Sequence, residues 1–138
     1  MSTVAADRHM MVSDQQESDI SIKRKTTKIF RVKGDIVGYV GDIALGQIFV
    51  KWYGNRKTDI THYDFSDFEA LALTPTGLYR YLHTLIPERV SPPFAIGSGT
   101  PYVLASIHNG SNLITAVKTA MHFDLYSGHG LHILRLRK

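Results

Sequence analysis

A glycine–serine–glycine turn between a short apolar strand and a helix constrains this chain more than any other stretch. The segment Phe94-Ala95-Ile96 is typical of a buried strand, and Gly97-Ser98-Gly99 follows it directly. We expect a helix from Pro101 to about His108, ended by Asn109-Gly110. Glycines in such a turn permit backbone angles and close approaches that a side chain would block. Ser98 is then either a simple helix cap or a hydroxyl held beyond the edge of the sheet.

Other strands come in pairs joined by short turns, which predicts β-hairpins. The expected strands are Ser2 to Ala6, Met10 to Val12, and residues 28–32, 36–40, 68–73, 78–82 and 131–136. The turns between paired strands contain Asp, Gly or Pro, as in Lys33-Gly34-Asp35. Residues 87–93 are expected to form a loop, and residues 62–67 predict no regular element.

Helical periodicity appears in two further stretches. Apolar residues recur at helical spacing over residues 43–52, with Asp42 as the expected N-cap and Gly54-Asn55 as the stop. Ser111 is expected to cap a second helix over residues 112–122. Strands, a helix, strands, two helices and a strand in this order indicate an α+β fold, with mainly antiparallel sheets and helices packed outside them.

Length and composition limit the possible classes of protein. The chain has 138 residues, which suits one domain, and no cysteine, which excludes disulfides and thiol catalysis. No apolar run approaches membrane-spanning length, and the start of the chain lacks the pattern of a secretory signal. The net charge of +4 comes from basic groups near residues 23–28 and 135–138, which predict a solvated face rather than a nucleic-acid site. We therefore expect a cytoplasmic protein with no membrane or nucleic-acid partner.

The seven histidines raise the question of a metal site. His122, His129 and His132 lie within one short segment, but their spacing matches no helical pair of ligands with a nearby glutamate. We interpret them as loop and strand residues, and we expect no metal and no cofactor.

Four segments of the chain together resemble a proteasome-type N-terminal nucleophile hydrolase. They are Met1-Ser2-Thr3-Val4, Val12-Ser13-Asp14, Thr27-Lys28-Ile29, and the glycine–serine–glycine turn followed by Asp124-Leu125-Tyr126-Ser127-Gly128. The chain is similar to the bacterial HslV peptidase and to short proteasome-like proteins of phage and bacterial genomes. The resemblance implies one domain over residues 1–138, a four-layer αββα sandwich, and a homo-oligomeric ring that takes peptides or unfolded proteins, with an unfolding ATPase as a candidate partner. It also implies the cytoplasm of a bacterial or phage-infected cell.

The resemblance also implies a set of site residues. Removal of Met1 would leave Ser2 with a hydroxyl nucleophile and a free α-amino group to act as its base. Lys28 would act as a nearby cation oriented by Asp14, and the backbone N–H of Gly41 would bind the oxyanion. Ser98, Asp124 and Ser127 would orient the amine and a water. We also expect Lys28 and Asp14 to pair close to Ser2, and Asp124 to accept a hydrogen bond from the amine or from Ser98.

Several alternatives remain open from the sequence. Taken alone, Lys28 is typical of a solvated strand edge, Asp14 of a turn and Asp124 of a local cap. Thr3 is an alternative nucleophile if cleavage falls between Ser2 and Thr3. The chain could instead be a non-catalytic scaffold of the same fold, a small-molecule amidase, or a nucleic-acid binder. Surplus apolar residues on the helices predict an oligomer, with Tyr53, Tyr102 and Met121 as candidate contacts.

Overall fold

Two antiparallel sheets form the centre of the molecule. The computed structural model describes residues 2–18 and 23–137, and Met1, whose removal the sequence predicts, lies outside them. The four-stranded sheet has the order β10 (Phe94–Gly97), β1 (Thr3–Ala6), β2 (Met10–Asp14) and β11 (Leu131–Arg135). The five-stranded sheet has the order β5 (Ile29–Val32), β6 (Asp35–Val40), β7 (Glu69–Thr74), β8 (Gly77–Tyr81) and β9 (Glu88–Val90). A separate hairpin pairs β3 (Gln16–Ser18) with β4 (Lys23–Lys25).

Three helices occur within the described residues: α1 (Ile43–Gly54), α2 (Thr100–His108) and α3 (Leu113–Phe123). Asp42 caps α1 as expected, because its side chain accepts a hydrogen bond from the Leu45 N–H at 3.0 Å. The expected cap of α3 is wrong by one residue. Asn112, not Ser111, has the extended backbone of a cap and accepts the Thr115 N–H at 2.9 Å.

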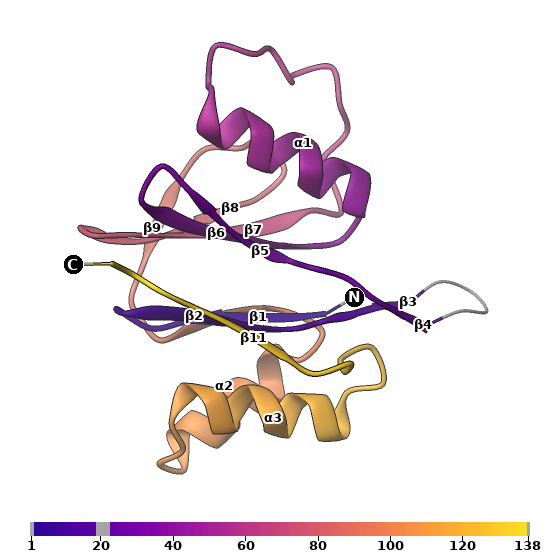
Figure 1. Ribbon diagram of the computed structural model, residues 1–138, viewed down its shortest axis with the longest axis vertical. Helices are drawn as coiled ribbons and strands as arrows, with labels where there is room; N and C mark the ends of the chain where they lie inside the picture. Colours follow the sequence, from indigo (N-terminus) through magenta and orange to yellow (C-terminus); the bar gives the residue numbers. More distant parts are fainter. Residues whose placement is uncertain (1, 19–22, 138) are drawn as a thin grey trace.

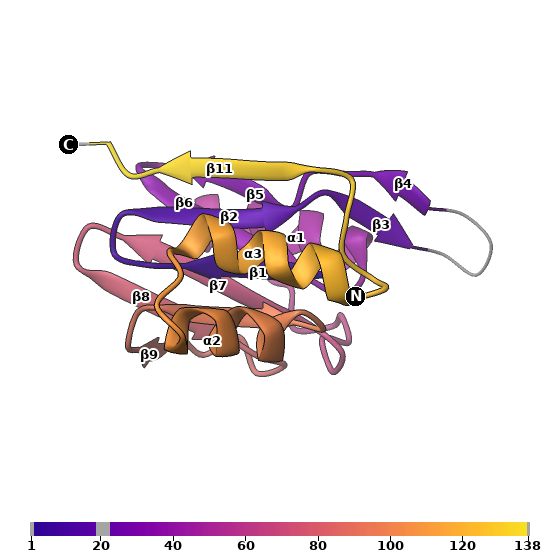
Figure 2. The ribbon, with the colours of Figure 1, turned by 90° about the horizontal axis from the view of Figure 1, so that it is seen from below.

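The sheets face each other, and the helices lie outside them. Figure 1 shows α1 over the outer face of the five-stranded sheet, and α2 and α3 over the outer face of the four-stranded sheet. In Figure 2, α3 lies over β1 and β2, and α2 lies beside α3. Val4, Met11, Ile36 and Leu71 belong to the cluster of buried residues that the facing sheet surfaces share. The small residues of β1 and α3, such as Ala5 and Ala116, pack together in a second cluster.

Two strand pairings differ from expectation. Residues 87–93 contain β9, which pairs with β8 in the register Leu78↔Val90, although a loop was expected there. The β3–β4 hairpin was not predicted, because its residues are polar and show no alternation of apolar side chains. Backbone hydrogen bonds form these edge pairs without an apolar face, so hydrophobic periodicity does not reveal them.

Tyr53 is not a surplus apolar residue on the outside of α1, contrary to the sequence-based expectation. It is only 9% exposed, and its hydroxyl donates to Asp35 Oδ2 at 2.7 Å. Tyr102, in contrast, is partly exposed and stacks on Phe123 with ring centroids 6.0 Å apart. The apolar surface around Phe123, Leu125 and Tyr126 therefore lies at the α2–α3 side of the molecule.

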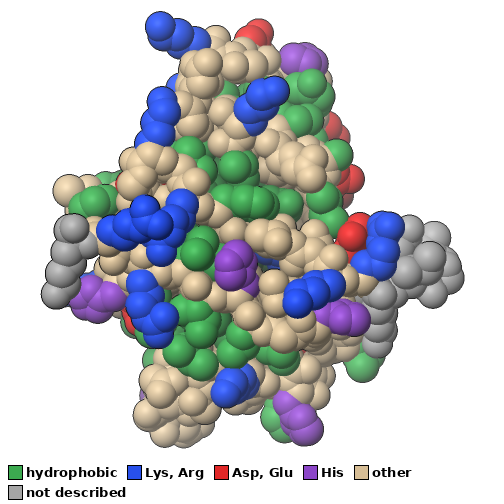
Figure 3. Space-filling model, in the orientation of Figure 1, with side chains coloured by type: hydrophobic (Ala, Val, Ile, Leu, Met, Phe, Trp, Pro, Cys, Tyr) green, Lys and Arg blue, Asp and Glu red, His purple; other side chains and the backbone are tan. Residues whose placement is uncertain are grey.

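The surface itself is mixed in character. On the face drawn in Figure 3, Lys and Arg side chains stand in several groups with apolar surface between them. No helix among residues 2–18 and 23–137 has the length and apolar character needed to cross a membrane.

Candidate active site

Ser2, Lys28 and Asp14 meet at one end of the sheets. Lys28 Nζ donates to Asp14 Oδ1 at 2.7 Å and also contacts Ser2 Oγ. The Lys28 side chain is 5% exposed and that of Asp14 is fully buried. Taken alone, Lys28 is typical of a solvated strand edge, but in the folded protein its side chain is buried. The structure brings the three residues into one hydrogen-bonded chain.

Strand pairing explains how these residues meet. β1 and β2 run antiparallel with Val4 opposite Ser13, so the start of β1 lies beside Asp14 at the end of β2. Lys28 comes from the other sheet, directly before β5, and its carbonyl accepts the Tyr39 N–H at 3.1 Å. The side chain of Lys28 thus spans the space between the two sheets to reach Ser2.

The carboxylate of Asp14 is surrounded by donors. Besides Lys28, it accepts backbone N–H groups of Thr3 at 3.1 Å, Gln16 at 3.2 Å and Gly128 at 2.9 Å. A buried carboxylate needs such partners, because burial without them is costly. Burial lowers the pKa of Lys28 from its ordinary value, and Asp14 opposes that effect. Asp14 is therefore the largest of the influences that favour the charged form of Lys28, ahead of Asp124 and Glu17.

Ser98, Asp124 and Ser127 form a second cluster, although two helices separate their turns in sequence. Asp124 Oδ2 accepts the Ser98 hydroxyl at 2.6 Å and the Ser127 hydroxyl at 2.7 Å. Asp124 Oδ1 accepts the Tyr126 N–H at 3.2 Å. Burial by itself raises the pKa of Asp124, but these hydrogen bonds outweigh it and hold the pKa below its ordinary value. Of the two donors expected for Asp124, the structure supplies Ser98.

Ser98 is not a helix cap. Gly99 is the N-cap residue of α2, and no side chain caps that helix. The close contact between the turn and β1 explains why the turn needs two glycines. A Cβ on Gly97 would lie 1.9 Å from the Ser2 carbonyl oxygen, and one on Gly99 would lie 1.9 Å from Thr3 Oγ1. Only glycine lets the turn approach the start of β1 so closely, which places Ser98 next to Asp124.

Thr3 links the two clusters, a role that sequence reasoning missed. Its N–H donates to Asp14, while its side-chain oxygen lies 2.7 Å from Ser127 Oγ. Thr3 is fully buried and its hydroxyl is engaged with Ser127, whereas Lys28 contacts the Ser2 hydroxyl. Within the described residues, the Ser2 hydroxyl is thus next to the Lys28 cation, whereas the Thr3 hydroxyl pairs with a serine. A hydroxyl residue directly after Ser2, at the start of an apolar strand, was the available signal.

Gly41 lies beside Ser2 in space. Both residues line a cavity of about 60 Å³, together with Lys28 and Tyr39. Gly41 has a φ of +111°, and a Cβ there would lie 2.7 Å from the Asp67 carbonyl oxygen. Gly41 also lines a second cavity, of about 600 Å³, with Asp42, Phe68 and His83.

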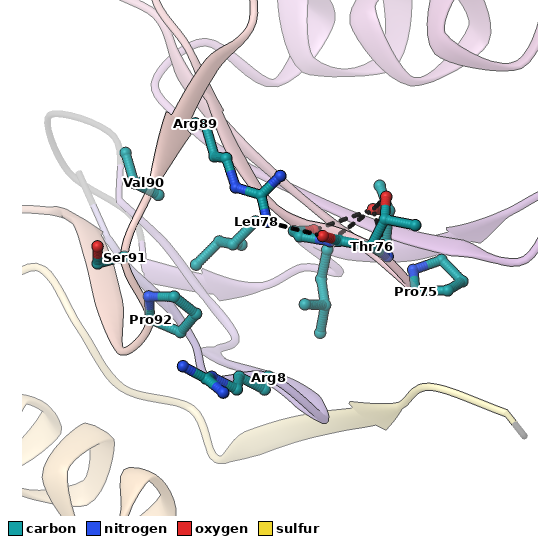
Figure 4. Close-up of a pocket in the computed structure, with 11 residues that line it drawn as sticks. Arg8, Pro75, Thr76, Leu78, Arg89, Val90, Ser91 and Pro92 are labelled. Atoms are coloured by element: carbon teal, nitrogen blue, oxygen red, sulfur yellow. Dashed lines mark hydrogen bonds between the residues drawn. The ribbon is translucent and has the colours of Figure 1, made fainter.

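Another cavity lies at the far end of β1 from Ser2. It has a volume of about 550 Å³ and is lined by Arg8, Thr76, Arg89 and Pro92 among others (Figure 4). Arg89 donates to the Thr76 carbonyl at 2.9 Å. None of the residues expected to act in catalysis lines this cavity. Within residues 2–18 and 23–137, no three His, Asp or Glu side chains are grouped so as to hold a metal ion.

The chain matches no protein-family model and no curated protein. Solved structures do match it, over nearly its whole length. BPH of Thiobacillus denitrificans in complex with epoxomicin has a TM-score of 0.75 at 17% identity, covering 99% of each chain. Thiobacillus denitrificans BPH in a further structure has a TM-score of 0.73 at 15% identity, covering 99% of this chain and 98% of that one. Eukaryotic HslV from Trypanosoma brucei has a TM-score of 0.68 at 15% identity, covering 99% of each chain. The chain therefore has the fold of HslV-like proteasome-type peptidases.

Proposed function

We propose that this protein is a proteasome-like N-terminal serine peptidase in which Ser2, exposed by removal of Met1, is the nucleophile. The observation that carries the proposal is the contact of Lys28 Nζ with both Ser2 Oγ and the buried carboxylate of Asp14. An unmodified serine hydroxyl is a poor nucleophile and needs neighbouring groups that accept its proton and stabilise its oxygen. The Lys28 cation would stabilise the oxygen, and the α-amino group freed by removal of Met1 would accept the proton.

The reaction proceeds in two steps. Ser2 Oγ attacks the carbonyl carbon of a peptide bond, and its proton passes to the neutral α-amino group, whose ordinary pKa is about 8. The Lys28 cation stabilises the developing negative charge on Ser2, and the Gly41 N–H binds the carbonyl oxygen as it becomes an oxyanion. The α-amino group returns the proton to the leaving amine. Water then attacks the acyl ester, which frees Ser2.

The cluster of Ser98, Asp124 and Ser127 positions the residues around Ser2. Asp124 holds the hydroxyls of Ser98 and Ser127, and Ser127 contacts Thr3, the residue that follows the nucleophile. In the proposal this network fixes the start of β1, so that the amine and a water keep their places around Ser2. Ser98, Asp124 and Ser127 are therefore positioning residues.

The same proposal covers the architecture and the assembly. We propose that α1, the two sheets, and α2 with α3 form the four-layer αββα sandwich of N-terminal nucleophile hydrolases. We further propose a homo-oligomeric ring with its sites turned inward and with peptides or unfolded chains as substrates. The exposed apolar side chains of Tyr102, Phe123 and Leu125 support self-association through the α2–α3 side. Light scattering at micromolar concentration tests this, and a monomeric mass contradicts it.

The test of the nucleophile combines mass and activity. Intact mass of the purified protein should show loss of Met1, and peptide hydrolysis should disappear in Ser2→Ala. Ser91→Ala is the matched control, because Ser91 is exposed and lines the remote cavity. Epoxomicin, which one similar protein binds, should add its mass to the wild type and to Ser91→Ala but not to Ser2→Ala. A Ser2→Ala variant as active as the wild type would show that Ser2 is not the nucleophile.

A small-molecule amidase is the second candidate, and the narrowness of the cavity beside Ser2 is the observation that favours it. The same chemistry would cleave a small acylamide. Comparison of acylamides with peptides of matched acyl groups separates the two activities. Retention of Met1 together with no hydrolysis of either class would instead indicate a non-catalytic protein.

A further inference from the structure

The cavity at the far end of β1 from Ser2 takes no part in the proposed function, yet it has the size of a ligand site. Its volume is about 550 Å³, and sites for small molecules usually enclose roughly 300–1,000 Å³. The β1–β2 turn, the β7–β8 turn and β9 contribute Arg8, Thr76 and Arg89 to its wall. Figure 4 shows Arg8 and Arg89 on opposite sides of this space. A ligand in the cavity would therefore meet an arginine on either side.

The charges that line this cavity are positive. Among the described residues, no Asp or Glu belongs to its lining, and the ion pairs involve neither Arg8 nor Arg89. Asp7, the carboxylate next to Arg8 in sequence, accepts two backbone N–H groups of its own turn. Glu88, next to Arg89, pairs with Arg80 at 2.7 Å. Both neighbouring carboxylates thus have other partners, and the two cavity arginines keep their charges for a ligand.

The Arg89 guanidinium is held in place by the protein itself. Its Nη2 donates to the Thr76 carbonyl at 2.9 Å, and its Cζ lies 5.9 Å from the centroid of the Tyr79 ring. It also lies against the β7–β8 turn at Gly77, where an added Cβ would fall 3.1 Å from Arg89 Cζ. A guanidinium carries several N–H donors, so the bond to Thr76 leaves others for an anion. Because Arg89 is already positioned, a ligand orders less of the side chain on binding.

We propose that this cavity binds a small phosphate monoester, with the phosphate between Arg8 and Arg89 and the organic group against Pro75 and Pro92. The dianion of a phosphate monoester matches two positive charges, and its three terminal oxygens can accept hydrogen bonds from both arginines. A carboxylate carries one charge, and a single bidentate arginine satisfies it. Pro75 is exposed and Pro92 partly exposed, so both offer apolar surface to the organic group. Binding here does not depend on the proposed role of Ser2.

Isothermal titration calorimetry with phenyl phosphate at low salt tests the proposal on the full-length protein. Phenyl phosphate should bind one to one, and at least about tenfold more tightly than benzoate, since it carries the second charge. Inorganic phosphate should also bind about tenfold more weakly than phenyl phosphate, because it has no group to lie against the prolines. Benzoate or inorganic phosphate that binds as tightly as phenyl phosphate overturns the proposal. So does the absence of saturable binding of phenyl phosphate up to about 10 mM, a concentration that covers weak ligands.

Variants assign the binding to the two arginines. Arg8→Ala and Arg89→Ala should each weaken phenyl phosphate binding by at least about tenfold, since each removes hydrogen bonds to a charged group. Arg56→Ala is the matched control, because Arg56 lines a different cavity of about 550 Å³, and its affinity should equal that of the wild type.

Circular dichroism checks that each variant is folded. Arg8→Lys or Arg89→Lys replaces an alanine variant that does not fold, and should still weaken binding severalfold, because lysine lacks the planar fork of donors. Wild-type affinity in any folded variant of Arg8 or Arg89 overturns the proposal. Equal weakening in Arg56→Ala would show general attraction of an anion to a positively charged protein, which overturns it as well.

Discussion

Lys28 Nζ lies 2.7 Å from Asp14 Oδ1, and the two side chains are almost fully shielded from water although they come from different sheets. Two buried charges are stable only when paired and hydrogen-bonded, and removal of one leaves the other uncompensated. The Lys28–Asp14 pair therefore joins the two sheets and delivers a cation to Ser2.

Lys28→Ala should reduce kcat/KM by about a hundredfold or more, because it removes the charge that stabilises the Ser2 oxygen. It should also destabilise the protein by about 3–5 kcal/mol, since Asp14 loses its buried partner. Peptide hydrolysis and urea unfolding measure the two effects. Lys118→Ala, at an exposed position of α3, is the control and should change neither. A fully active Lys28→Ala variant would rule out the electrostatic role.

A chain that keeps a residue before Ser2 should be inactive. Insertion of a lysine between Met1 and Ser2 gives a large second residue, from which we expect Met1 not to be removed. The nitrogen of Ser2 then remains an amide and cannot accept the hydroxyl proton. In the control protein, a cleavable tag and one alanine precede Ser2. Removal of both, which leaves Ser2 as the first residue, should restore activity. Wild-type activity in the lysine insertion, with intact mass showing both extra residues, would mean that no free α-amino group is needed.

Gly41→Ala should abolish activity and destabilise the fold more than Gly34→Ala. Both glycines have positive φ, of +111° and +88°, so each substitution carries a backbone cost of about 1–2 kcal/mol. Only at Gly41 would the new Cβ meet backbone, with the Asp67 carbonyl 2.7 Å away, whereas nothing lies within 4 Å at Gly34. Thermal unfolding and hydrolysis compare the variants. Equal behaviour of the two would argue against a special position for the Gly41 N–H.

Asp124→Asn should lower activity and reduce stability by about 1–3 kcal/mol, since it disturbs a carboxylate that holds two hydroxyls. The folded-state pKa of Asp124 is lowered, so its contribution to stability is present above the unfolded pKa of about 3.9 and is lost as pH falls below it. The stability difference between wild type and variant should therefore shrink in acid. Asp67→Asn, at an exposed position, is the control. A difference that grows in acid contradicts the assignment.

His132 should make the fold sensitive to mild acid. It lies opposite Ser13 in the β2–β11 pairing, and neither its Nδ1 nor Ser13 Oγ, both buried, has a partner within the described part of the chain. Burial lowers the pKa of His132, so the contribution is present above the unfolded pKa of about 6.5 and is lost as pH falls through and below it. The loss of stability from pH 7 to pH 5 should be smaller in His132→Gln than in wild type. The exposed His62→Gln should leave that loss unchanged.

Much of the local structure follows from the order of residue types. Alternating apolar residues and turn residues predict the hairpins of β1–β2, β5–β6 and β7–β8, and helical spacing with Asp42 predicts α1. These features depend on neighbours within a few residues, so a sequence displays them directly. The edge strands β9 and β3–β4 depend on backbone pairing with a partner strand, and their side chains carry no pattern that announces it.

The candidate site likewise has features that the sequence displays and features that only the fold determines. The residue types around Ser2, Asp14, Lys28 and the glycine–serine–glycine turn were recognisable from the sequence as a set that resembles a peptidase. Their roles depend on which groups the fold brings into contact. Only the tertiary structure decided that Lys28 is buried rather than solvated, and that Thr3 contacts Ser127 and so links two clusters. Burial and long-range contact arise from the packing of two sheets against each other, and no local rule along the chain contains that information.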